Sequence, residues 1–160
     1  MKRLWAPWRM KFVESQASDP NCVLCMVQYQ TSDKKNLIVF RGTGAYVILN
    51  RFPYTSGHLM VVSNIHLPSL EDLDAQTRFE MMELATKGIS VLRKVYQPAG
   101  FNFGANIGEA AGAGIAGHVH LHVVPRWSGD TNFMSALAET RVLPEQLKDT
   151  YRRVCSAWNK

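Results

Sequence analysis

The 160-residue sequence lacks any long hydrophobic run. No window in it approaches the roughly 20 consecutive apolar residues that a transmembrane helix needs. Residues 1–9 are basic, but no apolar stretch follows them, so we expect neither a signal peptide nor a membrane anchor. These absences argue against the membrane-bound and exported classes of protein, and we expect no membrane as a partner.

Cysteine is scarce, with three residues in the chain, an odd number. Without a secretion signal, this count argues against a disulfide framework and for reduced thiols, so we expect a cytoplasmic protein. Cys155 falls in a C-terminal stretch with a helical pattern, and we expect it to be a packed, inert thiol.

Dense clusters of charge are missing as well. The net charge is +5 and the pI about 9.3, but the basic residues are scattered in small groups such as Lys34–Lys35 and Arg152–Arg153. This distribution favours a nucleotide in a positive pocket over nucleic acid, which we do not expect as a partner. The composition, 46% hydrophobic and 19% charged, is ordinary for a globular protein without repeats, so residues 1–160 are predicted to form one domain.

The hydrophobic pattern predicts an α+β fold: an antiparallel sheet with one long helix packed across it and a C-terminal helix. Residues 1–20 are expected to be irregular. Short apolar runs bounded by turn residues predict strands at 37–40, 46–49, 58–62 and 101–106, followed by the strand that starts at residue 118.

The two helices are predicted from a change of period. The long one runs from Ser69 to about Tyr96, with Ser69 and Asp72 resembling a capping box. Its sheet-facing apolar stripe is expected to consist of Phe79, Met82, Ala85, Ile89, Leu92 and Val95. The second helix is expected over residues 143–158, with Pro144 near its first turn.

Histidine is also sparse, yet three of the five fall within five residues, as His118, His120 and His122. Alternate side chains of a strand share a face, so these imidazoles line up about 6.6 Å apart while the apolar residues between them point into a core. Such a row suits an extended polyanion, because a histidine pKa near 6.5 allows a nucleophile, an acid or a cationic clamp. A zinc-chelating row is the alternative; no acidic residue follows until Asp130, which favours phosphate, although one of the three can still serve a metal.

Residues 108–117, which precede the triad, contain four glycines, Gly112 and Gly114 among them. Glycine lets backbone N–H groups approach phosphate oxygens, so this segment predicts a phosphate cradle, a plain turn being the alternative. Asn106 can donate to a phosphate or cap its strand, and Asn50 can bind a ribose or serve a turn. A lone histidine such as His58 is more often a structural hydrogen-bonding group.

Cys22 and Cys25 have the spacing of zinc ligands, but two thiolates are half of a tetrahedral site and no second cysteine pair exists. His66 and one triad histidine are the available completions, so we predict a zinc site formed by Cys22, Cys25, His66 and His118. A redox dithiol is the competing interpretation. It would normally lie between a strand and a helix of a thioredoxin-like fold, a context that this sequence lacks.

Taken together, residues 50–58, 65–68 and 117–126 resemble the histidine triad (HIT) superfamily, and the resemblance spans nearly the whole chain. Residues 4–10 and 125–133 resemble a bacterial branch that contains diadenosine tetraphosphate phosphorylases. The resemblance implies a HIT-like fold, an adenine nucleotide or dinucleoside polyphosphate as substrate, and a homodimer.

The resemblance also implies a role for each candidate side chain. His120 would attack the α-phosphorus and form a nucleotidyl-imidazole, which is then passed to water or to phosphate. His122 and His58 would stabilise the phosphoryl oxygens. The nucleotide-binding residues would be Asn50 at the ribose and, at the phosphates, Asn106, Gly112, Gly114 and His122.

Two departures from the family pattern matter. Many HIT hydrolases have a hydroxyl residue three positions before the first triad histidine, where this chain has Ile115. That change removes the usual proton donor for the leaving group and argues against phosphoramidase activity. The alternatives are a nucleotide-binding regulatory protein with little turnover, which the missing hydroxyl would permit, and a nucleoside phosphoramidase. The predicted zinc ligands match a site that only some HIT proteins and the related uridylyltransferases have, and we expect the zinc to be structural.

Overall fold

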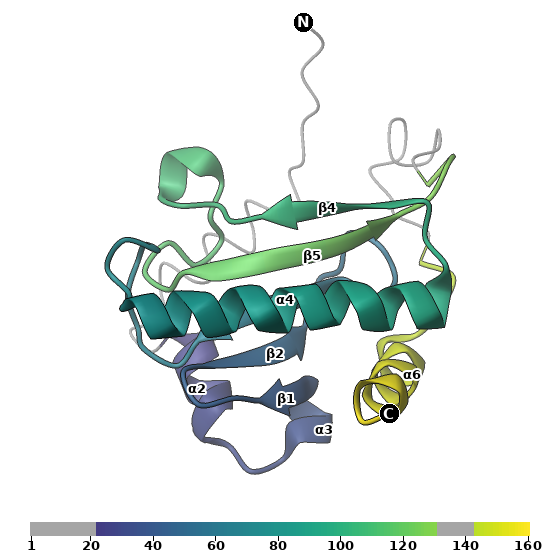
Figure 1. Cartoon of the computed structure of the whole chain (residues 1–160), viewed down its shortest axis with the longest axis horizontal. Helices are drawn as coiled ribbons and strands as arrows, with labels where there is room; N and C mark the ends of the chain where they lie inside the picture. The colour runs from purple at the N-terminus through teal and green to yellow at the C-terminus, as the bar shows by residue number, and fades with distance from the viewer. Residues whose placement is uncertain (1–21, 131–142) are drawn as a thin grey trace, which may run out of the picture.

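The structure, a computed structural model, describes residues 22–130 and 143–160, and its centre is a five-stranded antiparallel sheet in the order β1-β2-β3-β5-β4 (Figure 1). The strands are β1 (Ile38–Arg41), β2 (Ala45–Leu49), β3 (Leu59–Ser63), β4 (Gly100–Gly104) and β5 (His120–Arg126). The helices are α2 (Val23–Tyr29), α3 (Asp33–Asn36), α4 (Ala75–Tyr96), the 3-10 turn η1 (Glu109–Ala111) and α6 (Leu147–Trp158). The predicted α+β class is confirmed. The irregular segment expected over residues 1–20 lies outside the described ranges, and the single domain over 1–160 stays a prediction.

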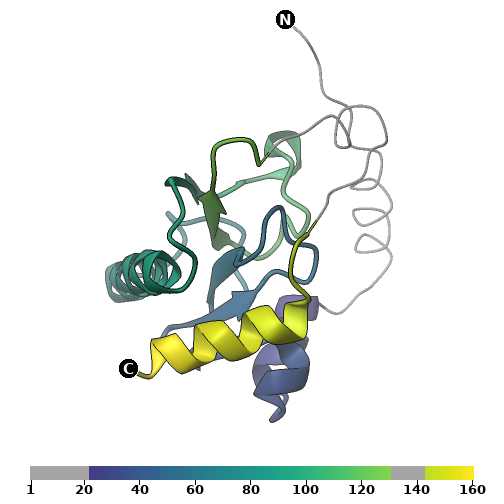
Figure 2. The ribbon, with the colours of Figure 1, turned by 90° about the vertical axis from the view of Figure 1, so that its right-hand side faces the viewer.

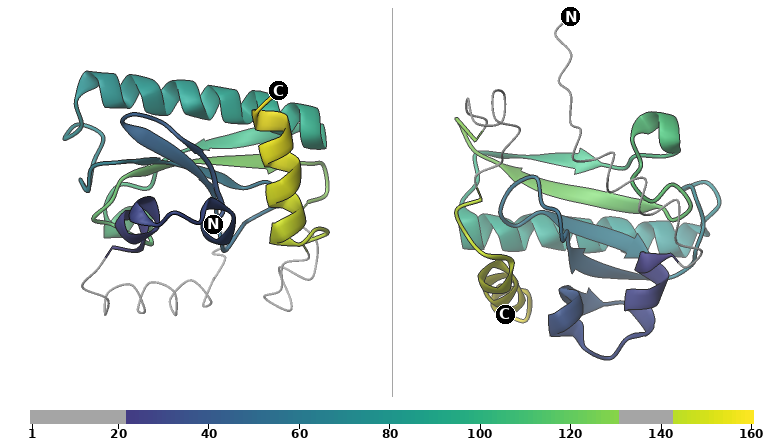
Figure 3. Two further views of the ribbon diagram at one scale, coloured as in Figure 1. Left: turned by 90° about the horizontal axis from the view of Figure 1, so that it is seen from below. Right: turned by 180° about the vertical axis from the view of Figure 1, so that it is seen from behind.

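The two faces of the sheet are covered by different helices (Figure 2). On one face α4 packs against β2, β3 and β5 and runs roughly along the strands in Figure 1, and buried side chains of the strands, such as Leu59 and Val61, join the main core. α6 packs against α4 and β1 and runs crosswise to α4 in the view from below (Figure 3). On the other face Leu24 of α2 packs in a smaller cluster with Tyr46 and Val62. The site described below lies on this second face.

The first turn of α4 differs from the predicted capping box. The helix begins at Ala75, and its N-cap is Asp74, whose Oδ1 accepts a hydrogen bond from the Thr77 amide at 2.8 Å. Asp74 also accepts from the Thr77 hydroxyl at 2.7 Å, so it satisfies two donors of the first turn. The Ser69 hydroxyl instead donates to the carboxylate of Glu71. The capping box at Ser69 was therefore wrong, because a stronger cap lies five residues later.

The predicted apolar stripe of α4 was also partly wrong. Phe79 and Met82 are 60% and 48% exposed, whereas Met81 is fully buried. The buried side passes through Gly88, where an added Cβ would lie 3.3 Å from Leu59 Cδ1 and 3.8 Å from the Trp158 ring. The helix thus approaches the sheet closely at Gly88, and two large apolar side chains, Phe79 and Met82, face outward.

The C-terminal helix begins at Leu147, not at residue 143, so Pro144 lies outside it, before the N-cap Gln146. The reason is visible at Glu145, whose carboxylate accepts hydrogen bonds from Tyr96, Thr150 and Arg153. These contacts hold the chain in a non-helical approach to α6. None of the helices within the described ranges combines the length and the apolar character that crossing a bilayer requires.

Candidate active site and metal centre

Two of the triad histidines, His120 and His122, lie in strand β5, and His118 lies in the segment before it. β5 starts at His120, so His118 lies two residues before it. The apolar residues that alternate with the histidines are buried in the main core under α4, as predicted: Val119, Leu121 and Val123. The imidazoles therefore point to the opposite face, where His118 and His120 are buried and His122 is half-buried. The rings of His120 and His122 are 4.9 Å apart, edge to face.

The ring of His120 has one defined tautomer. Its Nδ1 lies 2.8 Å from the His118 carbonyl oxygen, which can only accept, so Nδ1 carries the hydrogen and Nε2 carries the lone pair. Burial lowers the pKa of this imidazole, which keeps the ring neutral near pH 7. A neutral ring with one nitrogen fixed and the other basic is equipped for nucleophilic attack.

His58, immediately before β3, joins the triad through its ring. Its Nε2 lies 2.9 Å from His122 Nδ1, and the side chain is fully buried. The Tyr54 amide donates to His58 Nδ1 at 3.1 Å, and the Tyr54 ring packs on the His58 ring at 4.7 Å. The sequence pointed to His58 but missed Tyr54, because its amide has no sequence signature.

Asn50 lies at the end of β2, within reach of the same ring. Its Oδ1 accepts a hydrogen bond from the Phe52 amide at 2.9 Å, and its Nδ2 lies 3.4 Å from His58 Nδ1. The turn role named as an alternative is thus present. Thr55, further along the loop, donates its hydroxyl to the Pro125 carbonyl of β5 at 2.8 Å. The loop over residues 50–57 is thus tied to β5 through Thr55 and lies against His58 through Asn50.

The glycine-rich segment is partly a 3-10 turn, not an open loop. The Gly112 amide donates to the Glu109 carbonyl at 2.9 Å, and Gly112 has a left-handed φ of 81°. The Asn106 side chain, beyond the end of β4, donates to the Gly112 carbonyl at 3.3 Å. Gly114 lies in the turn that follows. Asn106 and Gly112 are therefore brought together, and Gly112 contributes a backbone conformation, its amide being engaged within the turn.

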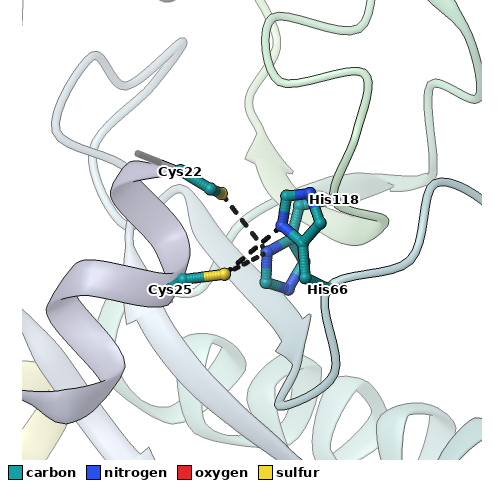
Figure 4. Close-up of side chains that lie close together, drawn as sticks. All are labelled: Cys22, Cys25, His66 and His118. Carbon is teal, nitrogen blue, oxygen red and sulfur yellow. Dashed lines mark hydrogen bonds between the residues drawn. The ribbon is translucent and has the colours of Figure 1, made fainter. Parts of the chain in front are cut away.

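The four predicted metal ligands converge on the same face of the sheet (Figure 4). The donor atoms of Cys22, Cys25, His66 and His118 all lie within 4.8 Å of one another. Cys25 Sγ is 3.3 Å from His66 Nδ1 and 3.5 Å from His118 Nδ1, and Cys22 Sγ is 3.4 Å from His118 Nδ1. Sulfur and nitrogen ligands at the corners of a zinc tetrahedron lie roughly 3.5 Å apart. The predicted ligand set is confirmed as a cluster suited to a metal ion.

The surroundings of the cluster also fit a cation. His118 Nε2 donates to the Ser63 carbonyl at 2.8 Å, which directs the lone pair of Nδ1 toward the two sulfur atoms. Burial lowers the pKa of His118, and burial together with the neighbouring Cys22 raises the pKa of Cys25. Two thiols packed together resist ionisation unless a positive charge is added, and a divalent metal supplies one. The Ser63 carbonyl, like the Tyr54 amide, was missed from the sequence.

Comparison with known proteins agrees with this geometry. The family model described as HIT domain matches residues 31–129, which include His58, His66 and the triad but not the cysteine pair. A Mycobacterium tuberculosis protein named AP-4-A phosphorylase is 41% identical in an alignment that covers 99% of this chain and 85% of the length of that protein. A Schizosaccharomyces pombe protein named asymmetrical bis(5'-nucleosyl)-tetraphosphatase is 28% identical, over 58% of this chain and 50% of its own.

Among solved structures, a similar one is a zinc-bound histidine triad family protein from Mycobacterium smegmatis. It superposes with a TM-score of 0.69 at 27% identity and covers 90% of this chain and 95% of its own. The match covers most of both chains and shows that they share the fold.

Proposed function

The chain belongs to the HIT domain family, and on that premise we propose that it cleaves dinucleoside polyphosphates at an α-phosphate through a covalent nucleotidyl-histidine intermediate. The observation that carries this proposal is the buried, neutral ring of His120, held by its Nδ1 so that Nε2 is nucleophilic. The names of the Mycobacterium tuberculosis and Schizosaccharomyces pombe relatives support the substrate class.

The reaction has two displacements at one phosphorus. In the first, Nε2 of His120 attacks the α-phosphorus, the bond to the bridging oxygen breaks, and the remaining nucleotide leaves with the electron pair. In the second, an acceptor oxygen attacks the same phosphorus and the phosphorus–nitrogen bond breaks, which restores the imidazole. His122 stabilises the charge on the non-bridging oxygens, and His58, whose Nε2 lies 2.9 Å from His122 Nδ1, acts through His122. Asn50 binds the ribose.

The phosphate chain is held on the other side of the triad. Asn106, which already contacts the carbonyl of Gly112, has a second amide hydrogen for a phosphate oxygen. The turn at Gly112 and Gly114 leaves room for the same oxygens beside Asn106, since an added Cβ at Gly112 would meet no atom within 4 Å.

Phosphate is the acceptor that we favour over water, because the 41%-identical relative bears the name of a phosphorylase. Incubation with diadenosine tetraphosphate, with and without inorganic phosphate, tests this by chromatography of the products. Phosphorolysis gives ADP and ATP, and hydrolysis gives AMP and ATP. Binding without turnover under either condition would favour the alternative of a regulatory nucleotide-binding protein and overturn the enzymatic proposal.

The leaving group distinguishes this function from a phosphoramidase. Ile115 is half-buried and packs with the α2 cluster that contains Leu24 and Val62, so its position supplies apolar contact and no hydroxyl. A polyphosphate leaves as a stable anion without protonation, whereas an amine must be protonated as it leaves. We therefore expect adenosine phosphoramidates to be cleaved far more slowly than diadenosine tetraphosphate in the same assay.

Zinc is the metal that the donor set fits best, held by Cys22, Cys25, His66 and His118. It would supply a structural cross-link and no catalytic step, since all four ligand positions are filled by side chains. The alternative of a metallohydrolase centred on the triad predicts immediate loss of catalysis on chelation. It is disfavoured because His118 Nδ1 faces the thiols and His118 Nε2 is bound to the Ser63 carbonyl, so His118 has no nitrogen for a metal shared with the other two triad histidines.

A homodimer is the assembly that the exposed surface supports. Phe79 and Met82 of α4 lie on one stripe with Arg93, whose guanidinium lies 5.1 Å from the Phe101 ring of the edge strand β4. Phe103 of the same strand is 44% exposed. An apolar helix stripe beside an edge strand is suited to pairing with a second copy. A cytoplasmic location remains the expectation from the free thiols.

A further inference from the structure

We propose that Tyr54 is a positioning residue for this reaction: its backbone amide and its ring fix the tautomer and orientation of His58, and His58 in turn makes His122 a hydrogen-bond donor toward the phosphoryl group. The proposal rests on the function proposed above. It concerns a residue in the loop between β2 and β3, on a segment that the triad pattern does not include.

The chain of hydrogen bonds starts at the backbone amide of Tyr54, which can act only as a donor. A backbone N–H can only donate, so the Tyr54 amide, 3.1 Å from His58 Nδ1, requires that nitrogen to hold its lone pair. A neutral His58 must then carry its hydrogen on Nε2. That nitrogen lies 2.9 Å from His122 Nδ1, so His122 accepts there and carries its own hydrogen on Nε2.

Asn50 points to the same assignment independently. Because its Oδ1 accepts from the Phe52 amide at 2.9 Å, its NH2 group is the one that lies 3.4 Å from His58 Nδ1. Two donor groups are thus aimed at one ring nitrogen. The opposite tautomer of His58 would bring its N–H against both donors.

The ring of Tyr54 holds the orientation that the amide selects. It lies 4.7 Å from the His58 ring at an angle of 33°, and 6.3 Å from the His122 ring. Rotation of either imidazole would have to displace this ring, and His58 is fully buried beneath its neighbours. The His122 ring is therefore already oriented in the folded protein, so little conformational entropy is lost when the substrate binds.

The consequence for the reaction is a fixed donor at the phosphoryl group. With Nδ1 occupied by His58, His122 presents an N–H on its other nitrogen, beside the ring of His120 at 4.9 Å. Negative charge on the non-bridging oxygens grows in the transition state, so this donor acts more on kcat than on KM.

The test separates the amide, the ring and the hydroxyl of Tyr54. Tyr54→Pro removes the N–H, Tyr54→Ala removes the ring, and Tyr54→Phe, the matched control, keeps both. With 15N-labelled histidine, NMR reports the protonated nitrogen of each of the five imidazoles without any substrate. We expect Nε2–H forms of His58 and His122 in wild type and in Tyr54→Phe, and mixed tautomers of both in Tyr54→Pro.

Kinetics on diadenosine tetraphosphate then complete the test. We expect kcat to fall roughly 10- to 100-fold in Tyr54→Pro and Tyr54→Ala, with KM within about threefold of wild type. If Tyr54→Pro does not fold, replacement of the Tyr54 amide by an ester through an α-hydroxy acid removes the same N–H with the ring retained. Unchanged tautomers in the amide-free protein, or an equal loss of kcat in Tyr54→Phe, would overturn the proposal. Correct tautomers in a wild type without turnover would instead overturn the proposed function.

Discussion

At the scale of single residues, one main-chain carbonyl joins the two halves of the site. The His118 carbonyl accepts the hydrogen of His120 Nδ1 at 2.8 Å, while the His118 ring contacts the thiols through Nδ1 and Ser63 through Nε2. Three neighbouring histidines thus have different tasks because their ring nitrogens have different partners. The first belongs to the candidate metal cluster, and the second is the nucleophile that we propose. The third accepts from His58.

Replacing His122 tests the division of labour within the triad. His122→Asn should lower kcat by about 10²–10³-fold, the size expected when one oriented donor at a developing oxyanion is lost. The covalent adduct should still form, since His120 is unchanged. Rapid-quench kinetics with labelled diadenosine tetraphosphate measure both quantities. Wild-type kcat, or an adduct missing altogether, would be inconsistent with a stabilising role.

The residue scale also shows what the sequence could predict. His118, His120 and His122 share a face because a strand has a period of two, and Cys22 and Cys25 were recognisable by their spacing. The Tyr54 amide and the Ser63 carbonyl were missed. Any residue supplies such groups, and only the folded loop aims them at a ring.

At the scale of elements, the carboxylate of Glu145 ties α6 to the C-terminal end of α4. It accepts hydrogen bonds from Tyr96 and Thr150 and pairs with Arg153 at 2.9 Å. The Tyr96 ring in turn packs beside Gly57, where an added Cβ would lie 3.1 Å from it, next to His58. The helix pair therefore packs against the loop that carries the candidate site residues Asn50 and Tyr54 and leads to His58.

Glu145 should make stability depend on pH. Partial burial acts to raise its pKa, but the hydrogen bonds from Tyr96, Arg153 and Thr150 outweigh it and hold the pKa below the usual value. A folded-state pKa that is depressed adds stability above the unfolded value, about 4.3, and that stability is lost as the pH falls through the folded pKa.

Glu145→Gln should therefore cost about 1–3 kcal/mol of unfolding free energy at pH 7, and less as the pH falls below about 4. Urea denaturation at pH 7 and at a pH below about 4 measures the free energy of unfolding under both conditions. Glu83→Gln, a change at an exposed acid of α4, is the matched control and should be neutral. An equal cost of Glu145→Gln at both pH values would contradict the ionic account.

The metal cluster joins elements that are far apart in the chain. Cys22 and Cys25 come from the start of α2, His66 from the segment after β3, and His118 from the approach to β5. The double variant Cys22→Ser with Cys25→Ser should lose the bound zinc and thermal stability before it loses the triad geometry. Cys155→Ser, a thiol in α6, should retain about one equivalent. Metal analysis measures the zinc content, and thermal unfolding measures the stability. Wild-type protein that contains no metal, although it was purified without a chelator, would refute the zinc assignment.

Helix limits were harder to predict than helix existence. The long helix was expected and is present, but Asp74 caps it instead of Ser69, and Phe79 and Met82 face outward. Several polar residues in this region can cap a helix, and local sequence does not rank them. The buried side of α4 was decided by the close approach at Gly88, a tertiary contact without local signature.

At the scale of the whole molecule, the sheet separates stability from chemistry. One face packs on α4 (Figure 2) and supplies the main core. The candidate metal ligands and the histidines lie on the other face. This division was predictable, because alternation along the triad strand assigns the two faces. The surface used for assembly was harder to predict, because Phe79 and Met82 of α4 were expected to be buried and are exposed.

Dimerisation should depend on that stripe. Phe79→Glu with Met82→Glu should convert a dimer into a monomer, because two charges would have to be buried at the interface. Lys148→Glu, an exposed position of α6 with the same total change of charge, should leave the dimer intact. Sedimentation velocity measures the outcome. A wild type that is monomeric at all concentrations would contradict the proposed assembly.

The central claim is that His120 forms a covalent bond to the α-phosphorus. The most direct measurement is trapping of an acid-labile nucleotidyl adduct by acid-free denaturation and mass spectrometry, in wild type, His120→Asn and His122→Asn. We expect the adduct in wild type and in His122→Asn, and its absence from His120→Asn. That variant should still bind nucleotide through Asn50 and the glycine-rich turn, with turnover several orders of magnitude lower. Turnover of His120→Asn at the wild-type rate would contradict the mechanism.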